Sequence, residues 1–184
     1  MKRAHLGASR ERDVTLPECG PEAFLAVVIK REAGDWRAFP GAEAAITAAA
    51  RAVSAHPSLT RLAGSEAGVV LADDALLRSL NGRYRATDAP TNVLSFPWQP
   101  PAGAPPQHPP YLGDVVLAGE TVAREARELA LSPLAHLQHL VVHGLLHLLG
   151  RGHENDAEAE AMEALESAIL AAIGVADPHL PARL

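Results

Sequence analysis

The residues of this chain best suited to chemistry are histidines that cluster in one short segment. Five of the nine histidines lie in it: His136, His139, His143, His147 and His153. His143 and His147 are four residues apart, so on a helix both imidazoles leave the same face, one turn apart. In that geometry two neutral ring nitrogens can bind one metal ion.

Gly150 follows this pair and offers the chain a way to turn back. Glycine takes the left-handed conformation that often ends a helix, and the reversal would bring His153 to the same ion as His143 and His147. Three histidines leave a fourth coordination position for water, as a catalytic metal site requires. The pattern predicts one divalent ion per chain. Nitrogen ligands favour Zn²⁺, although other divalent transition metals would also fit.

The remaining histidines of the cluster carry other expectations. His139 lies one turn before His143 on the same face. It could touch the ion, but a histidine in that place more often packs beside the ligands or orients them. His136 is expected to be a surface residue.

The same spacing occurs in the metzincin peptidases, whose general base is the glutamate directly after the first histidine. Here that position is Gly144, which cannot transfer a proton. A peptidase of that type is therefore not expected, although the metal scaffold is similar.

A second informative segment is LNGRYRATDAPTNVLSFP, residues 80–97. It places Arg83 and Arg85 on either side of Tyr84. Guanidinium groups match phosphate oxygens, and an aromatic ring can stack on a base. Taken alone, the pattern favours the simpler interpretation of a solvated helix end followed by a turn.

Several helices and strands must position these residues. Short apolar runs predict strands at 24–29, 69–71, 92–96 and 112–117. Helical spacing predicts helices at 42–55, 120–131, 133–149 and 156–173. A further helix is expected to begin at Asp73 or Asp74 and to break or loosen at Asn81-Gly82. A proline-rich loop is expected at 97–110. Strands mixed with helices, ending in a helical pair, predict one α+β domain.

Two of these helices concern the histidines directly. Ser132 is the expected N-cap of the helix that carries them, with Pro133 in its first turn. The last helix is expected to bury an apolar stripe that includes Met162 and Ile169, and to turn its glutamates toward water.

Composition sets further limits. The 184 residues suit a single domain, and 48% hydrophobic against 21% charged residues exclude disordered and collagen-like classes. The net charge of −6 means that any nucleic acid must be bound by a local basic patch. Cys19 is the only cysteine, which excludes an intrachain disulfide and suits a reducing cytoplasm. No signal peptide or membrane span is expected.

Together the two motifs resemble the YbeY family of bacterial endoribonucleases, which act in ribosomal RNA maturation and ribosome quality control. The family signature H-G-x-L-H-L-x-G-Y-D-H matches residues 143–153, and L-N-x-x-Y-R-x-x-D-x-P-T-[ND]-V-L-S-F-P matches residues 80–97 at every fixed position. Gly113-Asp114 and the Met162-Glu163 and Glu166 element match further parts. The resemblance covers about residues 67–174. One departure is Arg151-Gly152 in place of the family's Tyr-Asp.

This resemblance implies a zincin-like α+β fold, with a small mixed four-stranded sheet packed with about five helices. It implies that His143, His147 and His153 hold the metal and that Arg85 is catalytic. The enzyme domain is expected to span residues 21–184, after a flexible leader at 1–20.

The implied activity is metal-dependent cleavage of single-stranded RNA in maturation of the 16S rRNA 3′ end, in the cytoplasm. The implied partners are rRNA and the ribosome or its proteins, with no DNA or membrane partner. Two alternatives stay open: a ribosome-assembly factor with a structural metal, and a metal-dependent hydrolase of another substrate.

Overall fold

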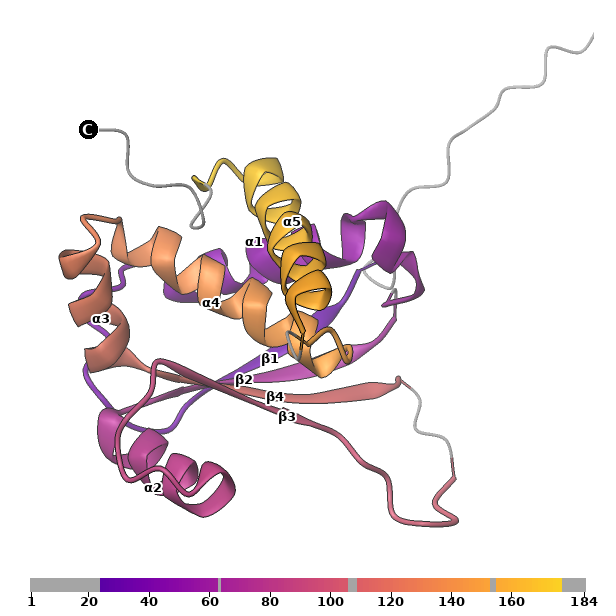
Figure 1. Ribbon diagram of the computed structural model, residues 1–184, viewed down its shortest axis with the longest axis horizontal. Coiled ribbons are helices and arrows are strands. Elements are labelled where there is room, and N and C mark those ends of the chain that lie inside the picture. The colour runs from indigo at the N-terminus through magenta and orange to yellow at the C-terminus, as the bar shows by residue number, and fades with distance from the viewer. Residues whose placement is uncertain (1–23, 63, 106–108, 153–154, 177–184) are drawn as a thin grey trace, which may run out of the picture.

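The computed structural model describes residues 24–176, except 63, 106–108 and 153–154. Its centre is a four-stranded sheet in the order β1-β2-β4-β3 (Figure 1). The strands are β1 (Ala26–Arg31), β2 (Glu66–Ala72), β3 (Val93–Pro97) and β4 (Tyr111–Ala118). β1, β2 and β4 are parallel, whereas β3 runs antiparallel to β4 at the edge of the sheet. The predicted mixed four-stranded sheet is confirmed.

Five α-helices accompany the sheet in the described part of the chain, as predicted. They are α1 (Ala42–Ala55), α2 (Asp74–Arg85), α3 (Gly119–Glu128), α4 (Pro133–Leu148) and α5 (Asp156–Ala172). A short 3₁₀ helix, η2 (Pro57–Leu62), follows α1 and was not predicted. Ser132 is the N-cap residue of α4, but its side chain makes no capping hydrogen bond.

The predicted break at Asn81-Gly82 is wrong, because α2 continues to Arg85. Asn81 is buried and its side-chain amide donates to the carbonyl of Ala89 at 2.8 Å, so it anchors the following loop from within the helix. One interior glycine costs a helix only about 1 kcal/mol, and the buried Leu77 of the same helix outweighs that cost.

The two faces of the sheet are covered differently. Helices α1, α4 and α5 lie on one face and α2 on the other (Figure 1). Alternate strand residues point to opposite faces, so Val69 and Leu71 join the main core while Val70 and Ala72 face α2. The main core is formed largely by aliphatic side chains, as expected from a sequence with 4% aromatic residues.

Helix α4 lies very close to the sheet at Gly144, the residue directly after His143. A Cβ atom at Gly144 would lie 2.6 Å from Cγ1 of Val115 in β4. On the same face, the hydroxyl of Ser95 in β3 donates to the Gly144 carbonyl at 3.1 Å. This contact fixes the turn that carries the histidines against the edge strand.

The predicted leader, residues 1–20, lies outside the described residues, so the domain boundaries stay a prediction. Among the described residues, no single helix has both the length and the apolar character needed to cross a membrane. Helices α3 and α4 have the required length and apolar character only when they are counted as one segment, and they meet at a bend of 117°.

The close contact at Gly144 gives the first prediction. Gly144→Ala should lower the free energy of unfolding by about 1–3 kcal/mol, because the buried and stiff Val115 must move. Gly82→Ala is the matched control: its Cβ would meet nothing nearer than 3.9 Å, so the same change should stabilise α2 by about 0.5–1 kcal/mol. Urea denaturation of both variants measures the difference, and equal effects at the two positions would contradict the packing argument.

Candidate metal centre

His143 and His147 lie on one face of α4, as their spacing predicts. Their Nε2 atoms face each other at 3.0 Å, and their ring centroids are 4.5 Å apart. Both side chains are half-buried at the surface of the core. Two zinc-bound nitrogens in a tetrahedral site stand about 3.3 Å apart, given metal–nitrogen bonds of about 2.0–2.1 Å. The pair is therefore close to the spacing that one ion requires.

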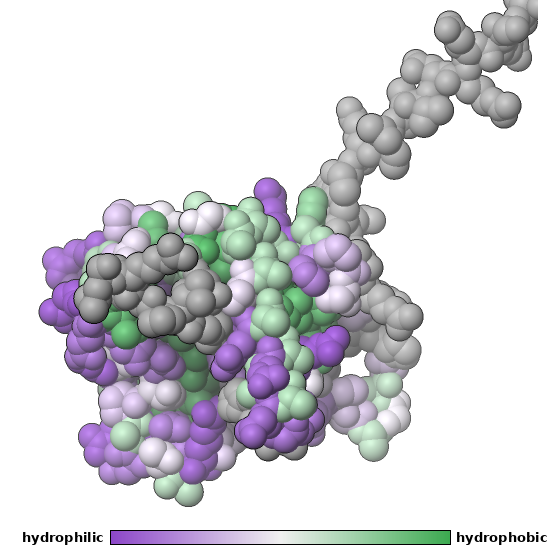
Figure 2. All heavy atoms as spheres, turned by 45° about the horizontal axis from the view of Figure 1, so that its top comes forward, coloured by the Kyte–Doolittle hydropathy of each residue, from purple (hydrophilic) through white to green (hydrophobic). Residues whose placement is uncertain are grey.

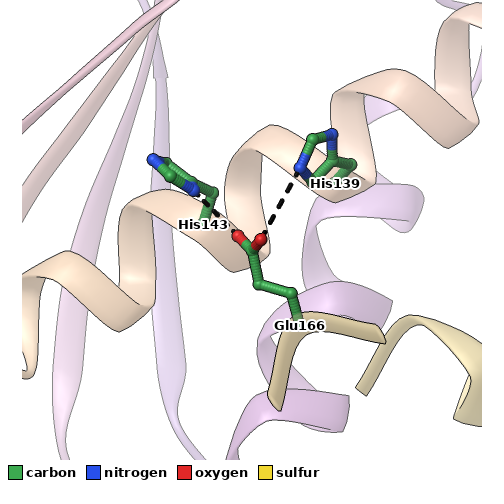
Figure 3. A group of neighbouring side chains, drawn as sticks. All are labelled: His139, His143 and Glu166. Atoms are coloured by element: carbon green, nitrogen blue, oxygen red, sulfur yellow. Dashed lines mark hydrogen bonds and ion pairs between the residues drawn. The ribbon is translucent and has the colours of Figure 1, made fainter. Parts of the chain in front are cut away.

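Behind His143 stands Glu166 of α5, whose carboxylate is almost fully buried (Figure 3). Its Oε1 lies 2.8 Å from His143 Nδ1. A carboxylate can only accept, so Nδ1 carries the proton and the neutral ring keeps its lone pair on Nε2, toward His147. Metal-binding histidines commonly have such a carboxylate partner, which fixes the ring and strengthens it as a ligand.

Sequence reasoning missed this role of Glu166. It expected the glutamates of the last helix to face water, and that expectation is wrong for Glu166, which is 1% exposed. A signal was present, because Glu166 follows Met162 by four residues and precedes Ile169 by three, and so shares the buried stripe. A carboxylate at a core position needs a polar partner, and two histidines of the facing helix α4 supply it.

His139 contacts the other oxygen of the same carboxylate. Its Nε2 lies 3.9 Å from Glu166 Oε2, and Figure 3 shows the carboxylate between the two rings. His139, His143 and Glu166 form a candidate metal-binding group, with one ligand atom from each within 4.8 Å of the others. They line a cavity of about 490 Å³ between α4, α5 and the start of β3. Imidazole and carboxylate donors suit a divalent transition metal.

His143 thus belongs to two groups through its two ring nitrogens. Nδ1 points to Glu166 and His139, whereas Nε2 points to His147. The short hydrogen bond to Glu166 occupies Nδ1, so Nε2 is the nitrogen better placed to bind an ion.

The expectation that His136 lies at the surface is wrong, because this residue is 4% exposed. Its Nε2 lies 2.9 Å from Oε2 of Glu125 in α3, which also accepts from the amide of Asn92 at 2.9 Å. Helix α3 packs against α4. His136 therefore ties α3, α4 and the start of β3 together behind the cavity.

The predicted reversal of the chain after α4 is described only as far as Gly152. His153 lies outside the described residues, so its part in the site stays a prediction. Gly150 does end the helix region in the left-handed conformation, at φ 72°, and the next amide returns to the carbonyl of Leu146. The chain thus begins the predicted reversal after α4.

Arg85 lies at the exposed C-terminal end of α2, on the opposite face of the sheet from the histidines. The edge strand β3 runs between them. The loop after Arg85 is fixed by Asn81 and by a two-bond ion pair between Arg78 and Asp88, at 2.7 and 2.8 Å. Much of the 80–97 motif therefore holds this loop and strand in place.

The role of Glu166 gives a second prediction. Glu166→Gln keeps the shape of the side chain but removes its charge, so the affinity of the protein for Zn²⁺ should fall about 10- to 100-fold. Glu160→Gln, an exposed position on the same helix that does not line the cavity, should leave this affinity unchanged. Competition with a chromophoric chelator measures both affinities, and wild-type affinity in Glu166→Gln would refute the role.

Comparison with known proteins shows the family to which the chain belongs. The family model described as Endoribonuclease YbeY matches residues 39–174, which include β2, both motifs and α5. An Endoribonuclease YbeY of Rhodopseudomonas palustris (strain BisB18) is 48% identical over 147 residues, 78% of this chain and 86% of that protein. One from Azorhizobium caulinodans is 50% identical over 149 residues, covering 80% and 92%.

Another relative and one solved structure extend the comparison. The Endoribonuclease YbeY of Nitrobacter winogradskyi is 43% identical over 181 residues, 93% of this chain and 88% of that protein. The solution structure of TM1509 from Thermotoga maritima aligns over 84% of this chain and 99% of its own, with 19% identity and a TM-score of 0.45. On the family model and these relatives, the chain belongs to the endoribonuclease YbeY family.

Proposed function

We propose that the protein is a metal-dependent endoribonuclease that cleaves single-stranded RNA and acts in maturation of the 16S rRNA 3′ end and in ribosome quality control. The observation that carries the proposal is the histidine pair of α4, with two Nε2 atoms 3.0 Å apart and a buried carboxylate behind one of them. A metal nuclease needs such a prepared ligand set, and Gly144 removes the glutamate that a peptidase of this spacing would use.

In this proposal His143, His147 and His153 hold one Zn²⁺ ion. The bound ion would lower the pKa of its water toward about 7 and polarise a phosphoryl oxygen. Glu166 keeps the proton of His143 on Nδ1 and so directs Nε2 to the ion. His139 packs against the same carboxylate and limits its movement.

Arg85 is proposed to stabilise the negative charge that builds on the phosphate in the transition state. Arg85 is at the C-terminal end of α2, on the opposite face of the sheet from the histidines, so the substrate must pass over the edge strand β3 to meet both. A single strand of RNA can bend in this way, whereas a duplex presents a stiff cylinder.

Charged side chains on α2 and α5 favour the same path for the RNA, over β3. The first turns of α5 expose Asp156, Glu158, Glu160 and Glu163, and hydrophilic side chains gather there in Figure 2. Phosphates are repelled from that side. The last turn of α2 instead carries Arg83 and Arg85, so the basic approach to the site lies along β3.

The proposed partners are rRNA and the ribosome or its proteins, and the proposed setting is the cytoplasm. The second candidate function is a ribosome-assembly factor whose metal is structural. His143 and His147 are half-buried, and His143 lines a cavity. This access favours catalysis, because a structural ion is usually enclosed by four protein ligands.

Variants of single residues test the assigned roles. His147→Ala should lose both tight Zn²⁺ binding and RNA cleavage. Arg85→Ala should keep the metal and lose cleavage about 100- to 1,000-fold. Arg127→Ala removes an equal charge from an exposed position on α3, where the side chain donates to the Ala123 carbonyl of its own helix, and should cleave at nearly the wild-type rate. Metal analysis and gel assays on single-stranded RNA measure these effects, and full activity of Arg85→Ala would show that its role is wrong.

Removal of the metal separates the two candidate functions. If the ion is catalytic, its removal should abolish RNA cleavage while the far-ultraviolet circular dichroism spectrum is unchanged and the melting temperature falls only slightly. Re-addition of Zn²⁺ should then restore cleavage. Unfolding on chelation, with no RNA cleavage by the untreated protein, would instead identify a structural ion and favour the assembly factor.

A further inference from the structure

Four aromatic side chains gather on the face of the sheet that carries α2. Tyr84 of α2 packs edge-on against Phe96 of β3, with ring centroids 5.1 Å apart. Trp98, directly after β3, packs in the same way against Tyr111 of β4, at 6.0 Å. We call these four residues the aromatic surface. Tyr84 is 59% exposed and Trp98 43%, although large aromatic rings are usually mostly covered.

Tyr111 reaches this face through an irregularity in β4. The pairing of β2 with β4 shifts register between Glu66 and Gly68, at the level of Tyr111 and Asp114. Gly113 makes the shift possible, because its φ of 129° is a conformation that other residues rarely adopt. A Cβ atom at this position would also clash with the Phe96 carbonyl oxygen. The bulge places Tyr111 and Asp114 together on the face toward Trp98.

Gly68 of β2 provides the room for this pair. A Cβ at Gly68 would lie 2.9 Å from the Tyr111 hydroxyl and would overlap the Asp114 carboxylate. The hydroxyl donates to Asp114 at 2.6 Å. Burial, together with Asp114, raises the pKa of Tyr111, so the hydroxyl stays a donor and holds the ring in place. Gly68 and Gly113 thus leave the space in which the Tyr111 ring lies beside Trp98.

Helix α2 covers only part of this sheet face. Its Leu77 belongs to a buried cluster with Leu94 and Val116, whereas Trp98 lies outside that cluster and is exposed. Phe96 and Trp98 are two residues apart, so they follow one another along the same face of the edge strand. Ser95, directly before Phe96, points to the other face and contacts α4 beside the histidines. The aromatic surface and the candidate metal centre therefore lie back to back across one strand.

The charged side chains around the aromatic surface indicate which class of ligand it would bind. The guanidinium of Arg83 lies 5.4 Å from the centroid of the Tyr84 ring, and Arg85 is on the same turn. The carboxylates of Asp114 and Glu66 lie on the β2 side. A ligand with a negative backbone and flat rings fits the β3 side, where cations and exposed aromatic faces occur together.

We propose that the aromatic surface binds the bases of single-stranded RNA by stacking, chiefly on Trp98 and Tyr84, next to the nucleotide held at the metal centre. This proposal rests on the proposed function, because it describes how the same RNA substrate is bound. Stacking is tolerant of sequence, so the surface would hold the strand across β3 without reading particular bases.

The intrinsic fluorescence of the protein tests the proposal directly. The chain has two tryptophans, and Trp36 is buried in the main core, so Trp98 is the one that a ligand can reach. Titration of the zinc-loaded protein with a short 2′-O-methyl oligouridylate, shown to be intact afterwards, should quench the emission as bases stack. An abasic oligonucleotide of the same length and charge should bind more weakly and leave the emission unchanged.

Variants of Trp98 complete the experiment. Trp98→Phe keeps a ring, so it should bind the oligouridylate nearly as well as wild type while losing the quenching. Trp98→Ala should bind it about 5- to 150-fold more weakly and raise KM for cleavage more than it lowers kcat. Efficient cleavage of RNA by wild type without quenching, or equal affinity of Trp98→Ala and wild type, would overturn the aromatic surface and leave the proposed function standing. Failure of wild type to bind or cleave any RNA would overturn both.

Discussion

The close approach of α4 to the sheet at Gly144 is the constraint from which the site follows. Helix α4 is a core helix whose residues on most sides are buried, yet it carries a row of imidazoles. Only a residue without a side chain lets the helix come within reach of Val115 and Ser95. The histidines on either side are then held at the edge of the core, where they are rigid but reachable. The packing that positions the ligands also excludes a glutamate at the place where a peptidase would carry its base.

A row of buried and half-buried imidazoles needs polar partners, and two carboxylates supply them. Glu125 pairs with His136, and Glu166 lies between His139 and His143. Leaving such rings without partners in the core would cost about 1–3 kcal/mol each. Each carboxylate also links helices, since Glu125 belongs to α3 and Glu166 to α5. The polar groups that prepare the site thus also fix the relative position of the three helices around it.

Much of the fold could be predicted from local pattern. The bounds of α1 agree residue for residue, and the Gly150 turn has the left-handed conformation that was expected of it. Long-range partners could not be predicted in this way. Helical periodicity shows that Glu166 and His136 are on helices, but not that each faces a partner on another helix. The aromatic surface was missed for the same reason, because the bulge at Gly113 brings Tyr111 to a face that simple alternation would not give it.

The edge strand β3 separates Arg85 from the histidines, and this separation limits the kind of substrate that can contact both. In the sequence Arg85 and the histidines are separate motifs, and in the fold they lie on opposite faces of one edge strand. A residue so placed can act with the metal centre only on a substrate that crosses the strand. A bent single strand of RNA meets that demand, since it can hold a phosphate at α4 while neighbouring nucleotides lie over β3 toward α2. A small soluble substrate does not, because it would contact one face at a time. The separation of the two motifs therefore favours a polymeric substrate over a small metabolite.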